Sequence, residues 1–312
     1  MPLIIENSPS QIDSTRRRIL VSTVSLLVSQ AWAGESLEVM HQGPESPGDK
    51  RDEYYWLLLD TALRRTAKRW GPYQIHSATT MNGLRAIQQL QSANLDIVAR
   101  TTNQKLEISL RPIRIPLDKG LLGYRVFLIR RDMQERLDRV HSLDDLKQFS
   151  IGQVQYWDDV TILRNSGFKV AAADRYEGLF PMLSAGRFDL LGRSVAEVAI
   201  ELQTRQQQFP DLVIEQGLLL YYPLPRYLFV RRDFYGEQLA LRIEDGFNLM
   251  INDGSFDRMF KVHSAPFEKI LNLSARRLFR IPNPLLPAET PLNKSKLWYV
   301  PNYLGRRSKR TI

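Results

Sequence analysis

The segment YEGLFPMLSAGRFDLLGRS, which runs from Tyr176 to Ser194, constrains the fold more than any other part of the chain. Its first half has the apolar spacing of a helix, and Gly186 follows where a helix C-terminus favours a residue that tolerates a positive φ. Phe188 to Leu191 is short and apolar, as in a buried central strand. Ser194 and Glu197 then fit a capping box that starts a new helix. This order of helix, strand and helix predicts an α/β protein.

The same order occurs earlier in the chain, where Asp96 is followed four residues later by Arg100 and then by Thr101. Arg193 and Ser194 follow another Asp at the same distance. The echo predicts two similar α/β lobes, each with one arginine at the C-terminal end of a strand, where open α/β sheets bind ligands. A match this short can also arise by chance.

The composition excludes several kinds of site. The chain has 312 residues, long enough for two ordinary domains, and its 43% hydrophobic and 25% charged residues are typical of a globular protein. It contains no cysteine, which excludes disulfides, thiolate zinc sites and cysteine nucleophiles. The four histidines lack the spacing of metal ligands, so we expect neither a metal nor a cofactor.

The N-terminus has the order of a secretory signal. Arg16 to Arg18 precede the uncharged run from Ile19 to Gly34, which ends in the small-x-small sequence Ala31-Trp32-Ala33. We predict that residues 1–33 form a cleaved signal peptide, which makes the mature protein periplasmic. The alternative, a transmembrane anchor, needs about 20 apolar residues. The arginine run fits either a Sec or a twin-arginine signal.

The net charge of +9 comes largely from the C-terminal end. Six basic residues follow Glu289, the last acidic residue, and give residues 282–312 the character of a basic, proline-rich tail. The body is therefore close to neutral. Basic tails are more often solvated termini than nucleic-acid arms, and no nucleic-acid motif is present, so we expect no nucleic-acid partner.

Alternating periodicities predict the other elements. Strands are expected at Leu37–His41, Tyr73–Ser77, Leu95–Ala99, Arg111–Pro116, Tyr124–Arg130, Ile151–Val154, Phe168–Ala172, Leu212–Glu215, Leu218–Tyr222 and Arg226–Val230. Helices are expected at Tyr54–Trp70, Met81–Ser92, Tyr235–Asn252 and Ser255–His263, and Ser142 with Asp145 predicts another helix start. Beyond Pro282, repeated prolines predict an extended segment packed on the body.

Several segments together resemble a known family. They are NLDIVARTTNQKLEISLRPIRIP, GYRVFLIRR, SLDDLKQFSIG, AGRFDLLGR, YPLPRYLFVRRD and INDGSFDRMFKVH. In number and order they are similar to the extracellular solute-binding proteins of family 3, the periplasmic components of amino-acid ABC uptake systems. The resemblance implies a two-lobe type II periplasmic binding fold. Lobe 1 would comprise residues 34–125 and 230–281, lobe 2 residues 126–229, and the strands at 124–130 and 226–230 would form the hinge.

The chain departs from the family pattern at two positions that matter for the ligand. Amino-acid binders of this family usually place an arginine after a Thr-containing turn to hold the ligand carboxylate, and here Lys105 stands near that place. They also usually place an Asp beyond the lobe 2 strand to hold the ammonium, and here Ser194 stands there, beside Arg193. Both departures put amino-acid specificity in question.

The candidate ligand-binding residues combine anion donors, hydroxyls and one aromatic ring. They are Arg100, Thr101, Thr102, Lys105, Trp157, Arg193 and Ser194. All but the two threonines have a structural alternative: an arginine can pair with a carboxylate of its own lobe, Ser194 can cap a helix, Trp157 can be a core residue, and Lys105 can be a solvated helix residue.

No enzyme is expected, because the chain contains no nucleophile elbow, P-loop, zinc-protease motif or dinucleotide fingerprint. Two functional classes remain. One is a receptor that captures a small, anionic or amino-acid-like ligand between two lobes for the membrane subunits of an ABC transporter. The other is a ligand-sensing or accessory periplasmic domain, with a membrane sensor as its partner.

Overall fold

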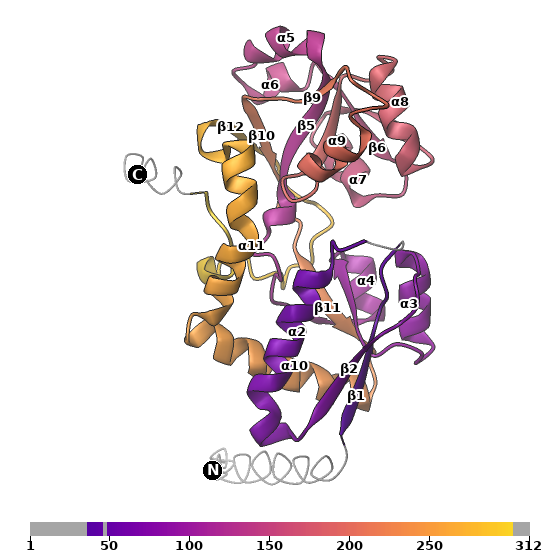
Figure 1. Ribbon diagram of the computed structural model, residues 1–312, viewed down its shortest axis with the longest axis vertical. Helices are drawn as coiled ribbons and strands as arrows, with labels where there is room; N and C mark the ends of the chain where they lie inside the picture. The colour runs from indigo at the N-terminus through magenta and orange to yellow at the C-terminus, as the bar shows by residue number, and fades with distance from the viewer. Residues whose placement is uncertain (1–35, 46–48, 302–312) are drawn as a thin grey trace, which may run out of the picture.

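The computed structural model describes residues 36–45 and 49–301, which form two lobes stacked along the long axis of the molecule (Figure 1). The expected signal peptide at residues 1–33 and the last part of the basic tail, residues 302–312, lie outside the described residues. None of the described helices is both long and apolar enough to span a bilayer.

Lobe 1 contains a parallel strand pair and an antiparallel three-stranded sheet, in which β11 lies between β3 and β4. A bridge between His41 and Ile97 joins the two sheets. The elements are β1 (Leu37–His41), α2 (Glu53–Trp70), β2 (Tyr73–Ser77), α3 (Gly83–Gln91), β3 (Val98–Thr101), α4 (Gln104–Ser109), β4 (Arg111–Ile113), β11 (Arg226–Val230), α10 (Phe234–Asn252) and α11 (Ser255–Leu271).

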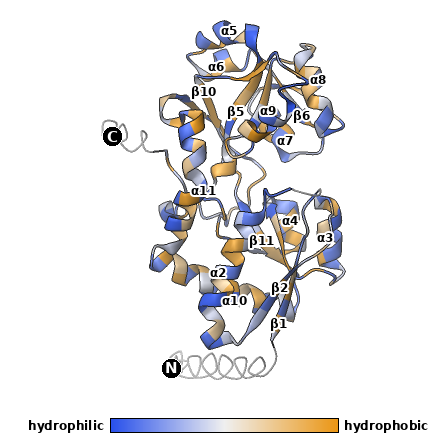
Figure 2. Cartoon of the chain, viewed as in Figure 1, coloured by the Kyte–Doolittle hydropathy of each residue, from blue (hydrophilic) through white to orange (hydrophobic). Residues whose placement is uncertain are grey.

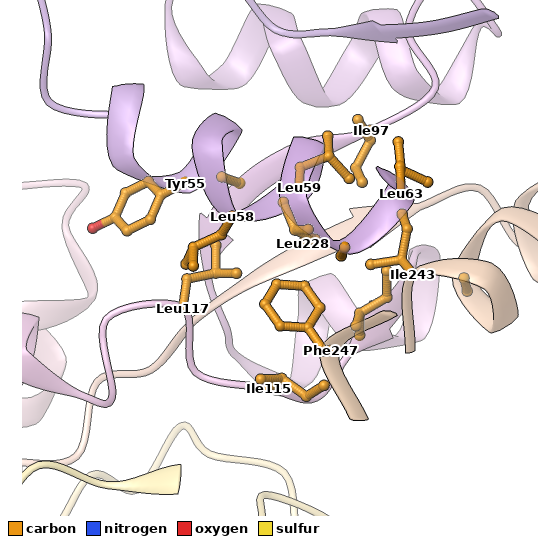
Figure 3. Packing of buried hydrophobic residues seen from close by; sticks show 14 of the residues in the cluster. Tyr55, Leu58, Leu59, Leu63, Ile97, Ile115, Leu117, Leu228, Ile243 and Phe247 are labelled. Atoms are coloured by element: carbon orange, nitrogen blue, oxygen red, sulfur yellow. The ribbon is translucent and has the colours of Figure 1, made fainter. Parts of the chain in front are cut away.

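The core of lobe 1 forms where α2 packs between the sheet and α10. Figure 3 shows Leu59 and Leu63 of α2 beside Leu228 of β11 and Ile243 of α10, and all four side chains are fully buried. The two helices approach closely because α10 has Gly246 at the contact, where a Cβ atom would lie 2.3 Å from the carbonyl oxygen of Ala62. Any larger residue at this position would force α2 and α10 apart.

Lobe 2 is built on one mixed sheet in the order β12-β10-β5-β8-β6-β7, with β9 also paired to β5. Its central strands are largely apolar, and β5 and β10 are mostly orange in Figure 2. The elements are β5 (Tyr124–Arg130), α5 (Gln134–Asp138), α6 (Leu143–Leu146), β6 (Ser150–Val154), α7 (Asp158–Asn165), β7 (Lys169–Ala173), α8 (Leu179–Ser184), β8 (Leu190–Ser194), α9 (Val198–Arg205), β9 (Leu212–Ile214), β10 (Leu218–Tyr221) and β12 (Arg277–Arg280).

The local signals of the segment at 176–194 are confirmed in part. Gly186 follows α8 with a φ of +70°, and the capping box of Ser142 with Asp145 opens α6 as expected. The strand is shifted, however, because β8 continues through Ser194 instead of ending at Leu191. The predicted capping box at Ser194 and Glu197 is wrong, since α9 begins only at Val198 and has no side-chain cap. Pairing with β5 extends the strand past its apolar residues.

The chain crosses between the lobes just ahead of β5 and β11, the two strands expected to carry the hinge. The domain boundaries differ from the expected ones in two places. β11 begins at Arg226 and lies in the sheet of lobe 1. β12, expected within lobe 1, pairs in parallel with β10 of lobe 2. β12 lies in lobe 2 because α11 does not end at His263 but continues to Leu271 and carries the chain into that lobe (Figure 1).

The segment after β12 contacts both lobes, which matches the expected extended tail packed on the body. We call residues 281–300 the C-terminal strap. Leu297 is buried in the core of lobe 1, whereas Tyr299 packs against the core of lobe 2. Between them, the Trp298 ring lies where a Cβ on Gly120 would be 2.6 Å away, so the first crossing segment needs glycine there. The strap therefore joins the lobes a fourth time.

A histidine in α11 makes the packing of this helix sensitive to acid. The rings of His263 and Tyr54 stack at 3.9 Å, and burial lowers the pKa of His263 to about 4. An unfolded histidine titrates near 6.5, so between about pH 6.5 and 4 the unfolded chain binds more protons than the folded one. Acidification through this window therefore favours unfolding.

We expect His263→Phe, which keeps a stacking ring and removes the titration, to lose less thermal stability than the wild type between pH 7 and pH 4.5. Differential scanning calorimetry at both pH values measures this difference. Equal decreases in Tm for the two proteins would contradict the role assigned to His263.

Candidate functional site

The two arginines of the sequence echo both lie at the ends of strands, one in each lobe. Arg100 is the third residue of β3, and Arg193 is the fourth residue of β8. Their surroundings differ, because one guanidinium is paired and the other is not.

Arg193 is buried, with 5% of its surface exposed, and is fully engaged within lobe 2. Its Nε and Nη2 donate to the two carboxylate oxygens of Glu201 at 2.7 and 2.6 Å, and Nη2 lies 3.0 Å from Glu197. Its guanidinium also lies over the rings of Trp157 and Tyr176, at 4.9 and 5.3 Å. Burial alone would lower the pKa of Arg193, but Glu197 and Glu201 raise it well above its ordinary value.

Trp157 and Ser194 are arranged around this ion cluster. Trp157 is half-buried at the start of α7, with Arg193 stacked on its ring. Ser194 is fully buried, and its hydroxyl accepts from the amide of Ala196 at 3.3 Å. The structural alternative for Arg193, pairing within its own lobe, thus accounts for its contacts, whereas Ser194 does not cap a helix and bonds instead to the neighbouring backbone.

Arg100 of lobe 1 is half-buried and lacks such a partner. Its Nη1 donates to the carbonyl oxygen of Ala99 at 3.1 Å, while Nε and Nη2 are enclosed without an acceptor. No carboxylate of the described residues lies within ion-pair distance of it. Burial, reinforced by the charge of Arg226, lowers the pKa of Arg100 to about 10.

The other candidates in lobe 1 follow Arg100 along the chain. Thr101 ends β3 and is half-buried. Thr102 is fully buried, and its hydroxyl donates to Glu107 at 2.5 Å. Lys105 is exposed on α4. No contact between Lys105 and Arg100 is found among the described residues.

The lobes meet through a direct hydrogen bond and through opposed charges. Asn103, at the start of α4, donates to Asp158 of α7 at 3.0 Å, and burial raises the pKa of Asp158. Burial would also raise the pKa of Glu197 in lobe 2, but cationic side chains lower it overall. Two of these cationic side chains belong to lobe 1. Arg51 lies in the loop before α2, and Arg226 is the first residue of β11.

In the described part of the chain, no group of three or more histidine, aspartate or glutamate side chains is arranged to hold a metal ion.

Comparison with known proteins shows what this arrangement is similar to. No protein-family model and no curated protein matches the sequence. Among solved structures, the probable amino-acid ABC transporter extracellular-binding protein ytmK from Bacillus subtilis matches with a TM-score of 0.52 at 14% identity, over 73% of this chain and 97% of the other. The VFT2 domain of BvgS from Bordetella pertussis, a double mutant, matches with a TM-score of 0.51 at 17% identity, over 80% of this chain and 97% of its own.

The chain has the two-lobe periplasmic binding protein fold. The resemblance to the solute-binding proteins of family 3 is therefore confirmed at the level of the fold.

The periplasmic binding protein fold also brings together residues that sequence reasoning missed. Asp52, which precedes α2, accepts from Arg226 Nη1 at 2.7 Å and from Gln42 Nε2 at 2.9 Å. In lobe 2, Arg125 Nη2 lies 2.9 Å from Asp159, which also accepts from the Tyr222 hydroxyl. An Asp before a helix looks like an N-cap, and only the fold shows that Asp52 holds an arginine from a distant strand.

The ion cluster of Arg193 should be a stability element of lobe 2. We expect Glu201→Gln to lower the free energy of unfolding by about 3 kcal/mol, the lower end for a broken buried ion pair, because Glu197 remains. Urea denaturation measures this loss. The matched control is Glu177→Gln, whose carboxylate is 72% exposed and pairs with Arg205, and which should cost less than about 1 kcal/mol. A Glu201→Gln variant as stable as the control would show that Arg193 does not depend on this pair.

Proposed function

We propose that the protein is exported and captures a small, anionic or amino-acid-like ligand between its two lobes. The observation that carries the proposal is the polar face where the lobes meet. There Asn103 of lobe 1 bonds directly to Asp158 of lobe 2, and the enclosed guanidinium of Arg100 lies three residues before Asn103. A ligand that contacts both lobes would favour the closed arrangement by its difference in affinity for the two states.

The ligand site that we propose uses only part of the expected set. Arg100 and Thr101 contribute from lobe 1 and Trp157 from lobe 2. Arg193 packs on the ring of Trp157 and does not bind the ligand itself, because its donors are already directed at Glu197 and Glu201.

For partners, we favour the membrane subunits of an ABC-type uptake system, as the name of the similar Bacillus subtilis protein suggests. The alternative is a ligand-sensing or accessory periplasmic domain. The match to the VFT2 domain of BvgS favours this alternative. That match covers 80% of this chain, compared with 73% for the Bacillus subtilis protein. Genes for transporter subunits beside the coding region would support the first reading, and a gene for a signalling membrane protein would support the second.

We propose binding without catalysis. A ligand found by screening should therefore be recovered unchanged after prolonged incubation, and release of a product would overturn this point.

Ligand binding should bring the lobes closer together. A thermal-shift screen of amino acids, organic acids, phosphates and sulfonates selects a ligand, and small-angle X-ray scattering then compares the free and the saturated protein. We expect a smaller radius of gyration with ligand, because hinge closure shortens the molecule along the axis that joins the lobes. A tight ligand that leaves the scattering curve unchanged would contradict capture between the lobes.

Export should remove the N-terminal segment. Mass spectrometry of the protein from the native envelope is expected to find a mature N-terminus near Gly34, since Ala31-Trp32-Ala33 fits a cleavage site. Detection of residues 1–33 on protein in the cytoplasm, with none in the envelope, would refute export.

A further inference from the structure

Buried and half-buried arginines of the described chain differ in how their charge is satisfied. Arg193, Arg226 and Arg125 each lie within 3 Å of a carboxylate, and Arg276 lies 3.3 Å from Glu215. Arg242 has no carboxylate but donates to the carbonyl of Gly71 at 2.7 Å and to other carbonyls at the end of α2.

Arg100 is the exception among them. One of its nitrogen atoms reaches the carbonyl of the preceding residue, and Nε and Nη2 have no acceptor among the described residues. Enclosing a charged group without a partner is costly, and proteins normally avoid it. The arrangement indicates that an acceptor from outside the chain belongs beside this guanidinium.

The first turn of α3 lies against the same guanidinium. A Cβ atom on Gly83, the first residue of α3, would be 3.2 Å from Arg100 Nη2, so the absence of a side chain lets the two come together. Asn82 caps the helix by accepting from the amide of Arg85 at 2.9 Å. The amides of Gly83 and Leu84 have no acceptor among the described residues.

Electrostatics makes this contact unfavourable unless an anion is present. A helix N-terminus carries about half a positive charge, and Arg100 adds a full one. Burial and the charge of Arg226 disfavour a protonated Arg100, and the carboxylates of Asp52 and Glu45 offset part of this effect without pairing with it. The N-terminus of α3 and the guanidinium of Arg100 thus both favour an anion at this spot, and no carboxylate of the described residues pairs with Arg100.

The position of this spot suits a ligand held between the lobes. Arg100 lies at the C-terminal end of β3, and Asn103, three residues later, bonds to lobe 2. By contrast, Lys105, the second residue of α4, is exposed to solvent.

We propose that Arg100 and the first turn of α3 form the lobe 1 subsite for an oxyanion group of the ligand, of the carboxylate, sulfonate or phosphate class. The guanidinium supplies two donors in a fork, and the free amides of α3 supply further donors on the same side. This inference rests on the proposed function but makes its own claim about ligand chemistry.

The test uses Arg100→Met, which keeps most of the side-chain volume and removes the charge. Without added anion, the variant should be more stable than the wild type by roughly 2–4 °C in Tm, because an unpaired buried cation has been removed. The control is Arg226→Met, which removes an arginine paired with Asp52 at 2.7 Å and should lower Tm instead. A decrease in Tm for Arg100→Met like that of the control would overturn the proposal.

The second part adds anions. Millimolar sodium sulfate, phosphate and succinate, compared with sodium chloride of equal ionic strength, should raise the Tm of the wild type and weaken or lose that effect in Arg100→Met. Sulfate also stabilises proteins non-specifically, so the difference between the two proteins is the quantity that counts. The pattern among the three anions identifies the preferred oxyanion. The same response in both proteins, or its loss in Lys105→Met instead, would overturn the proposal.

Failure of this inference can be distinguished from failure of the proposed function. If a ligand from the screen closes the lobes of Arg100→Met with unchanged affinity, the subsite is wrong and capture between the lobes stands. If the ligand binds at least about tenfold more weakly to Arg100→Met but no compound closes the lobes, the subsite stands and the capture mechanism is wrong.

Discussion

A buried guanidinium needs an acceptor, and this requirement shapes the face where the two lobes meet. Arg193 is held by Glu197 and Glu201, Arg226 by Asp52, and Arg125 by Asp159. These pairs fix the side chains that line each lobe and leave little room for new charges. The guanidinium of Arg100 is different, because the described chain supplies a carboxylate to each of these three arginines and supplies none to Arg100.

The connections between the lobes set the limits within which that face can open. Besides the two crossings expected of the fold, α11 runs from the core of lobe 1 into the core of lobe 2, and the C-terminal strap returns across the hinge. Tyr299 illustrates the coupling, since its amide donates to Lys119 of the first crossing and its carbonyl accepts from Tyr124 of β5. These hydrogen bonds tie the strap to the first crossing and to β5.

The comparisons and the geometry answer different questions. Similarity to solved periplasmic binding proteins at 14% and 17% identity establishes the fold and nothing about the ligand. The ligand chemistry has to come from the residues of this chain, and they depart from the pattern expected for the family. Lys105 is exposed and Ser194 is buried, with its hydroxyl accepting from the amide of Ala196, whereas the unpaired guanidinium of Arg100 lies five residues before Lys105.

The sequence alone predicted most of the local structure. The bounds expected for β1, β2, β5 and β11 agree with the structure to the residue, and the capping signals at Ser142 and Gly186 were confirmed, because such features depend on near neighbours in the chain. The sequence patterns failed where tertiary contacts extended an element. Pairing with β5 carries β8 on to Ser194, and packing against the core of lobe 2 accompanies the continuation of α11 to Leu271.

The partner of each charged group was decided by tertiary structure. Arg100 and Arg193 occupy equivalent places in a repeated sequence pattern, so the sequence treated them as equals. In the folded chain, α9 places Glu201 against Arg193, while the N-terminus of α3, which offers donors instead of acceptors, lies against Arg100. Whether a buried cation is neutralised depends on which elements pack beside it, and that is settled only when segments distant in sequence come together.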